Sequence, residues 1–208
     1  MAFRILKGTA RRAFLRDVHR ADALLQERRL DEGRAILLGL RDALARKGLQ
    51  SAEVIWSLAV AADCGNDQVE ALRLITEALA LDPLSKGINN SLEIIAGRVK
   101  AALASKDWTV TEPSTPALYR LLVDVGEADE ETHVAMARFY AAAGEADAAL
   151  ALLEATTTVF PGCREAWAEK AAVARRLGDV AAAERADLEV AALGGEAASV
   201  TVTWRGVA

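Results

Sequence analysis

Few residues in this chain combine the types and spacings that catalysis or metal binding would need. Its 208 residues include two histidines, His19 and His133, and two cysteines, Cys64 and Cys163. The histidines are not spaced to bind a metal ion from one face of a helix, and neither a phosphate-binding loop nor a dinucleotide-binding glycine pattern occurs. Ser57 and Cys64 carry nucleophilic groups, but the sequence offers no base partner for them. We therefore expect no enzymatic activity, no metal and no cofactor.

Composition narrows the class of protein further. Hydrophobic residues make up 52% of the chain but aromatic ones only 5%, so Ala and Leu supply most of the apolar content and helices are favoured. A charged fraction of 26% is ordinary for a folded domain. The net charge of −5 argues against a general nucleic-acid binder. No apolar run is long enough to span a membrane.

The cysteines and the start of the chain bear on the compartment. Cys64 and Cys163 lie far apart, and no CxxC occurs. The basic start, MAFRILKGTARRAFLRD, lacks the continuous apolar stretch and cleavage site of a secretory signal. We expect a reduced, cytoplasmic protein, and the preference for Arg over Lys suggests a bacterial one.

Three segments of the chain repeat one another. EETHVAMARFYAAAGEADAALALLEATTTVFPG begins at Glu130, and REAWAEKAAVARRLGDVAAAERADLEVAALGG begins 34 residues later at Arg164. A third copy, AEVIWSLAVAADCGNDQVEALRLITEALALDP, begins at Ala52. A fixed period of this length indicates stacked helix–turn–helix units, because one helix pair cannot bury its apolar face alone.

These copies resemble the tetratricopeptide repeat. In that family a large residue stands at position 4, small residues stand at positions 8, 20 and 27, Gly stands near 15 and Pro at 32. Glycine there permits a left-handed turn between the two helices, small residues allow close helix approach, and Pro follows the second helix. Gly65 lies one residue early for position 15. The residues in register are Leu58, Ala59, Ala71, Ala78, Pro83, Tyr140, Gly144, Ala149, Pro161, Trp167, Gly178 and Ala183.

The resemblance predicts an all-α, right-handed superhelical solenoid of about five helix pairs over residues 1–195. The pairs are expected at about 3–49, 52–85, 86–126, 130–163 and 164–195. In the first pair Ala35 is expected at position 20. Ser51 and Asp129 are expected to cap helices, as is Thr115 before Pro116. The third pair is irregular, with a helix at about 85–105, a loop around Trp108 and a short helix at 116–125.

The resemblance also implies a partner site. Tetratricopeptide solenoids bind peptides or helices in the concave groove lined by the first helix of each pair, at positions 2, 5, 9, 12 and 13. A charge clamp for a carboxylate, known in the family, is not reproduced here, although the arginines favour an acidic segment. The expected groove residues are Glu53, Trp56, Val60, Asn90, Arg98, Arg138, Ala172, Arg175 and Arg176. His133, at position 4, is expected to pack between helices.

The two ends of the chain leave alternatives open. In the first helix Phe3, Leu6, Ala10, Phe14 and Val18 share one side, with Arg4, Lys7, Arg11, Arg12 and Arg16 elsewhere. Such a helix either packs on the next pair or docks residues 1–20 on an anionic membrane. The tail at 196–208, in which Val200, Val202 and Trp204 alternate with polar residues, either docks on the solenoid or supports association through a strand. Gly194 and Gly195 are expected to form its hinge.

We therefore expect a non-catalytic adaptor or scaffold that binds another protein. The alternatives are a membrane-peripheral assembly component, associated with the inner membrane through the N-terminal helix, and a secretion-type chaperone.

Overall fold

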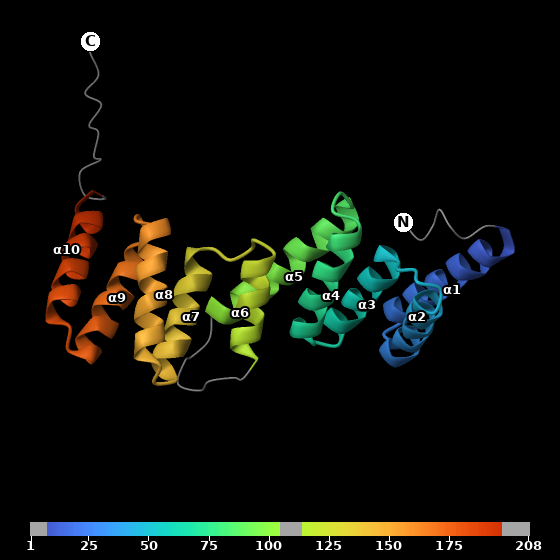
Figure 1. Cartoon of the computed structure of the whole chain (residues 1–208), viewed down its shortest axis with the longest axis horizontal. Helices are drawn as coiled ribbons and strands as arrows, with labels where there is room; N and C mark the ends of the chain where they lie inside the picture. Colours follow the sequence, from blue (N-terminus) through green and yellow to red (C-terminus); the bar gives the residue numbers. More distant parts are fainter. Residues whose placement is uncertain (1–7, 105–113, 197–208) are drawn as a thin grey trace, which may run out of the picture. The chain divides into compact units, whose positions relative to one another are not determined.

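The computed structural model describes residues 8–104 and 114–196, which form ten helices and no strand (Figure 1). The expectation of an all-helical repeat fold is confirmed. The N-terminal part of the first helix, the loop around Trp108 and the tail beyond Glu196 lie outside these residues. The helices are α1 (Gly8–Gln26), α2 (Leu30–Ala45), α3 (Ala52–Cys64), α4 (Gln68–Leu81), α5 (Lys86–Ala104), α6 (Thr115–Asp124), α7 (Glu130–Ala142), α8 (Ala146–Val159), α9 (Arg164–Leu177) and α10 (Val180–Glu196).

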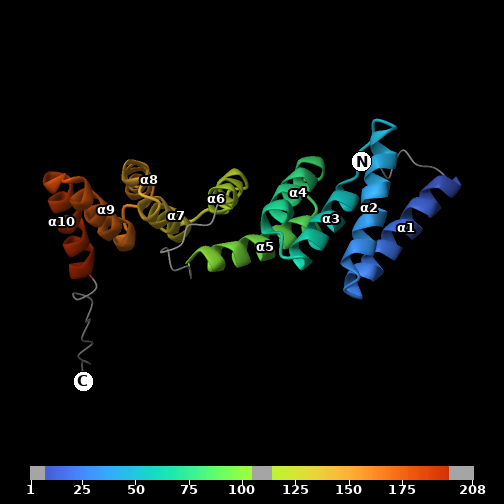
Figure 2. The same cartoon turned by 90° about the horizontal axis from the view of Figure 1, so that it is seen from below.

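Two compact units divide the chain. The first comprises Met1–Ala101 with Arg120–Glu127, and the second comprises Ala102–Tyr119 with Ala128–Ala208. In the first unit α1 to α4 pack in chain order (Figure 2). The side chains of Val18, Leu37, Leu72 and Ile75, one or two from each of α1, α2 and α4, are fully buried. Each helix thus buries an apolar stripe against its neighbours, as the repeat pattern requires.

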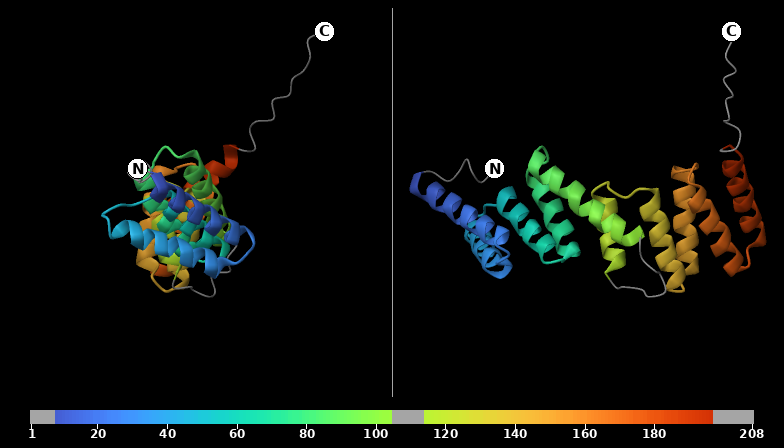
Figure 3. Two further views of the ribbon diagram at one scale, coloured as in Figure 1. Left: turned by 90° about the vertical axis from the view of Figure 1, so that its right-hand side faces the viewer. Right: turned by 180° about the vertical axis from the view of Figure 1, so that it is seen from behind.

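In the second unit α7 to α10 also pack in chain order, and α7 additionally contacts α9 (Figure 3). Its core joins Val134 and Ala137 of α7, Leu153 of α8, and Ala166 and Val173 of α9. Contact between the first helices of two successive pairs is the stacking that the repeat period predicts.

Side-chain caps begin several of the helices. Ser51, Asp67 and Asp129 each accept a hydrogen bond from the backbone N–H three residues on, at 3.4, 3.1 and 2.9 Å. The prediction for Thr115 is wrong, because α6 already includes it and Leu118 N–H donates to the carbonyl of Ser114. In the described part of the chain the buried Thr115 hydroxyl has no hydrogen-bond partner.

Left-handed residues close the turns between paired helices. Gly144 and Gly178 have φ of +84° and +79°, as their position in the repeat predicts. In the copy from Ala52, however, Gly65 has φ of −84°, and Asn66 adopts the left-handed conformation with φ of +61°. Asn is the residue after Gly that best tolerates this region. Asn66 therefore occupies position 15, and the apparent one-residue slip at Gly65 disappears.

A small residue lies five positions after each left-handed residue that closes a turn within a pair. Ala71, Ala149 and Ala183 follow this rule, and all three are buried. In the first pair the left-handed residue is Arg28, with φ of +63°, so the rule selects Gly33. A Cβ atom on Gly33 would lie 2.9 Å from Leu25 Cδ2 and 3.1 Å from the Ala21 carbonyl oxygen.

The assignment of Ala35 to this close crossing is therefore wrong, since Ala35 is exposed. Sequence spacing alone could not reveal this, because the residue that marks the turn is an arginine. Only the backbone conformation locates the register of the first pair.

The prolines at position 32 have a second role. The carbonyl of Pro83 accepts a hydrogen bond from Asn89 Nδ2 at 3.1 Å, and that of Pro161 accepts one from Trp167 Nε1 at 2.9 Å. In each case the donor lies six residues on, at position 4 of the next pair. This side chain ties the end of one pair to the first helix of the next.

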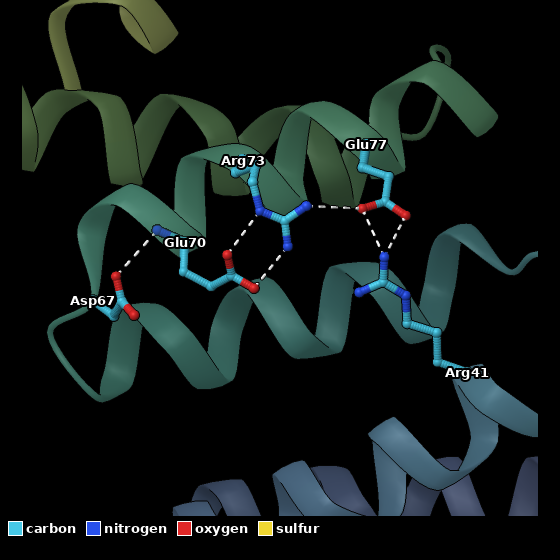
Figure 4. Close-up of polar contacts among 5 residues, drawn as sticks. All are labelled: Arg41, Asp67, Glu70, Arg73 and Glu77. Atoms are coloured by element: carbon cyan, nitrogen blue, oxygen red, sulfur yellow. Dashed lines mark hydrogen bonds and ion pairs between the residues drawn. The ribbon is translucent and has the colours of Figure 1, made fainter. Parts of the chain in front are cut away.

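A charge network joins α2 to α4 (Figure 4). Arg41 Nη2 donates to both oxygens of Glu77, at 2.8 and 3.0 Å, while Arg73 binds Glu70 through two hydrogen bonds and lies 3.4 Å from Glu77. The hydrogen bond from Arg73 lowers the pKa of Glu70. Because Arg41 and Glu77 link α2 to α4, we assign the network to packing of the first two pairs.

The last helix ends close to the expected boundary at residue 195. α10 includes Gly194 and Gly195 in its last turn and ends at Glu196, so these glycines belong to the helix and do not separate it from the tail. The tail that they were expected to release lies outside the described residues.

Candidate functional site

Two predicted groove residues of α3, Trp56 and Val60, lie around one cavity in the first unit, and Cys64 joins them. Trp56, Val60 and Cys64, at positions 5, 9 and 13, line a cavity of about 390 Å³. They recur at intervals of four residues, which places them on one face of the helix. The other lining residues come from α1, the following turn and α3: Asp22, Leu25, Gln26, Arg28 and Ser57.

Trp56 is held from the α5 side. Its indole Nε1 donates to Ser91 Oγ at 2.9 Å, and a Cβ atom on Gly87 would lie 2.9 Å from its Cη2. The absence of a side chain at Gly87 thus creates the space in which the ring lies. The ring is anchored at one edge and exposed to the cavity elsewhere, which is how an aromatic side chain serves as a rigid contact surface.

Trp56 also lines a second cavity, of about 260 Å³. Glu53, at the predicted position 2, lines it together with Asp82. Burial raises the pKa of the half-buried Glu53, nearby Asp22 raises it further, and His19 opposes the shift. This carboxylate has lost part of its hydration without gaining an ion pair in the described part of the chain.

Sequence reasoning missed the contribution of α1. Ser57 Oγ donates to Asp22 Oδ1 at 2.9 Å, so its hydroxyl is held by a carboxylate and not by a histidine. Asp22 carries no motif, and it faces α3 only because α1 and α3 are the first helices of successive pairs. An acidic residue midway along the first helix is the only sequence signal that could have suggested it.

The predicted groove residues of α5 differ in their surroundings. Arg98 forms an ion pair with Asp63 of α3, whose side chain is only 15% exposed. Asn90 is exposed, and its neighbour Asn89 makes the contact with Pro83 described above. Arg98 therefore helps to hold α5 against α3 and is not a free cation of the groove.

The arginines of the second unit are also engaged within the chain. Arg138 of α7 binds Glu165 at 2.5 Å and Glu169 at 2.7 Å, both on α9. Arg175 pairs with Asp187 of α10. Arg176 Nη2 donates to the carbonyl of Ala141, at the C-terminal end of α7, at 3.1 Å. Ala172 is exposed beside them.

These contacts show that the three arginines have a structural role. Each of them links two helices of the second unit, and two of them do so between charged side chains. A guanidinium that already binds a carboxylate has less to offer an acidic partner.

His133 packs between aromatic rings. Its Nδ1 lies 2.7 Å from the hydroxyl of Tyr119, and the centroid of its ring lies 6.0 Å from that of Phe160. Burial lowers the pKa of His133, and Asp129 opposes this. Neutral imidazole accepts the tyrosine hydrogen bond when Nε2 carries the proton.

The described part of α1 packs inward. Phe14 and Val18 are 6% and 0% exposed, so the apolar face they share is covered by this unit. Among residues 8–104 and 114–196 no helix is long and apolar enough to cross a bilayer. No group of three potential metal ligands lies together in that same part of the chain.

The helix pairs, their left-handed turns and their small crossing residues are now established, and a comparison with known families agrees with them. The tetratricopeptide repeat model matches residues 130–173, which span α7, α8 and most of α9. The chain carries a tetratricopeptide repeat. No curated protein sequence matches the chain.

Several solved structures resemble this tetratricopeptide-repeat chain at low identity. The crystal structure of a MamA protein is 13% identical, covers 91% of this chain and 96% of its own, and has a TM-score of 0.45. MamA AMB-1 is 15% identical over 94% and 98% of the two chains, with a TM-score of 0.43. MamA 41-end from Desulfovibrio magneticus RS-1 is 13% identical over 88% and 96%, with a TM-score of 0.38. The assignment rests on the repeat match and the helix pairs, and supports a protein-interaction scaffold in general terms.

Proposed function

We propose that this chain is a non-catalytic scaffold that holds a segment of a partner protein against Trp56 in the groove of α1, α3 and α5. The observation that carries the proposal is the pair of cavities that share an anchored tryptophan in their lining. Trp56 is fixed through Ser91 and Gly87 before any partner arrives, so little side-chain entropy is lost on binding. Aromatic residues in such positions contribute strongly to protein interfaces.

Membrane docking receives less support. It requires the apolar side of α1 to face lipid, whereas Phe14 and Val18 are buried in the first unit. A secretion-type chaperone would shelter an apolar segment of its partner, and the groove contains carboxylates beside its apolar residues. We therefore favour the scaffold.

Site-specific photo-crosslinking tests the proposal. A photoreactive amino acid replaces Val60 in the groove or, as a control, Leu38 of α2, which is 41% exposed. In cells that naturally make this protein, we expect a partner to be crosslinked from position 60 and not from position 38. Mass spectrometry identifies the partner, which is then purified.

Titration of that purified partner completes the test. Val60→Trp fills part of the cavity without adding charge, and Leu38→Trp is the matched control. We expect Val60→Trp to weaken binding at least about tenfold and Leu38→Trp to leave it unchanged. Equal effects of the two substitutions, with unchanged melting temperatures, would place the binding surface outside this groove.

A further inference from the structure

We infer that the groove around Trp56 recognises a Lys or Arg side chain of its partner, adjacent to an apolar one. This inference rests on the proposed function and deepens it, because it names the chemistry of the partner segment. The sequence suggested an acidic partner, on the strength of arginines at groove positions. Of the four charged residues that the structure places in the lining of the two Trp56 cavities, three are carboxylates.

Three carboxylates line the two cavities that share Trp56. Asp22 lines the larger cavity, and Glu53 and Asp82 line the smaller one. None of the three forms an ion pair with another residue that the structure describes. Among the described residues that line the two cavities, Arg28 is the one cation, and it lies at the α1–α2 turn. The balance of charge around the indole is therefore negative.

The surroundings of Glu53, one of these carboxylates, raise its pKa. It is half-buried, and burial and the nearby Asp22 together raise its pKa. A guanidinium or ammonium group placed between the two carboxylates would replace the water that Glu53 has lost. Charge-assisted hydrogen bonds in a partly desolvated site are stronger than those at an open surface.

The indole of Trp56 supplies a second source of cation affinity. A cation over the face of a tryptophan ring is attracted by the ring electrons, and Arg stacks on such a ring through its planar guanidinium. Ser91 and Gly87 hold the ring where Trp56 lines both cavities. The aromatic ring and the carboxylates thus both favour a cationic side chain.

Apolar residues near the same carboxylates indicate that the partner segment also carries an apolar side chain. Leu25 and Val60 line the larger cavity. Ile94, which lies on α5 between Ser91 and Arg98, is 47% exposed. A partner segment gains most when an apolar side chain covers these residues while its neighbour reaches the carboxylates.

The test uses three fluorescent peptides of about twelve residues with amphipathic helical spacing. The first contains Lys and Leu, the second Glu and Leu, and the third Lys and Ser. Each is titrated into the full chain at physiological ionic strength, which screens binding to scattered surface charge. Fluorescence anisotropy reports the affinity.

Two double variants separate the site from net charge. Asp22→Asn with Glu53→Gln removes the groove carboxylates while keeping their size. Asp147→Asn with Glu184→Gln makes the same change of charge at exposed positions of α8 and α10. We expect the Lys–Leu peptide to bind the unmodified chain. The groove variant should bind it at least about tenfold more weakly, and the control variant within about twofold of the original affinity.

The outcomes distinguish this inference from the proposed function. If the Glu–Leu peptide binds as well as the Lys–Leu peptide, or the control variant loses as much affinity as the groove variant, the cation preference is overturned. Val60→Trp then decides whether the groove is used at all: loss of Glu–Leu binding keeps the scaffold proposal. Lys–Leu binding that is unaffected by Val60→Trp overturns both. Failure of the Lys–Leu peptide to bind at about 1 mM also overturns the inference.

Discussion

At the scale of single residues, backbone conformation shows which residue closes each turn between paired helices, and residue type predicts this only in part. Gly144 and Gly178 close their turns with positive φ, as their place in the repeat predicts. The equivalent turn after α3 uses Asn66, because Gly65 is one position too early and has negative φ. Both residues are consistent with a turn, so the sequence located the turn but not its left-handed residue.

This difference predicts opposite effects of two neighbouring substitutions. Asn66→Ala places a Cβ-bearing residue without a local hydrogen-bonding side chain in the left-handed region, and we expect it to cost about 1 kcal/mol of unfolding free energy. Gly65→Ala keeps an allowed conformation, and the new Cβ would lie 3.4 Å from the carbonyl oxygens of Ala61 and Ala62. We expect it to be neutral or to stabilise by up to about 1 kcal/mol. Urea denaturation of both variants measures the difference, and a larger loss for Gly65→Ala would contradict the assignment.

At the scale of helices, one small residue lies at the close crossing in four of the helix pairs. Gly33, Ala71, Ala149 and Ala183 lie five residues after a left-handed residue and are buried. The spacing from turn to crossing is fixed by the helix period, since the second helix must present the same face in every pair. Small size at these positions is a packing requirement, and it leaves no room for a larger side chain.

Enlarging one crossing residue should therefore destabilise its pair. Ala149 is 0% exposed, and we expect Ala149→Leu to lower the unfolding free energy by about 1–3 kcal/mol through overpacking of α7 against α8. Ala151→Leu, two residues on at an exposed position of α8, is the matched control and should change it by no more than about 0.5 kcal/mol. Thermal and urea melts report both. Equal stability of the two variants would show that the register of this pair is wrong.

At the scale of the whole molecule, two titratable groups make stability depend on pH in opposite directions. His133 in the second unit has a lowered pKa, so the folded chain favours its neutral form. Its contribution is complete above the unfolded pKa of about 6.5 and is lost as pH falls through the folded pKa. Glu53 in the first unit has a raised pKa, so its unfavourable contribution grows as pH rises through the unfolded value near 4.3.

Comparison of two variants separates these contributions. Between about pH 7.5 and 5.5 we expect the melting temperature of the unmodified chain to fall, and His133→Gln to reduce that fall because the side chain no longer titrates. Glu53→Gln serves as the control. Protonation of Glu53 stabilises the fold as pH falls, so removing this carboxylate should not reduce the fall in melting temperature. An identical pH profile for the chain and His133→Gln would show that burial of the imidazole has no effect on stability.

The sequence by itself determined the helical class, the period and most of the repeat signature of this protein. These features follow from local chemistry: glycine and asparagine permit left-handed turns, small residues recur with the helix period, and capping side chains act within three residues. The same local logic placed Trp56 and Val60 on one face of α3 and His133 at a packing position.

Only the tertiary structure decided the charge of the candidate site and the register of the first pair. Arg98, Arg138 and Arg175 look like free cations in the sequence, yet each pairs with a carboxylate 12 to 35 residues away. Asp22 carries no motif but lies beside Trp56, because stacking brings α1 against α3. Such pairings depend on which helices become neighbours, and that is set by packing between pairs and not by any local pattern of residues.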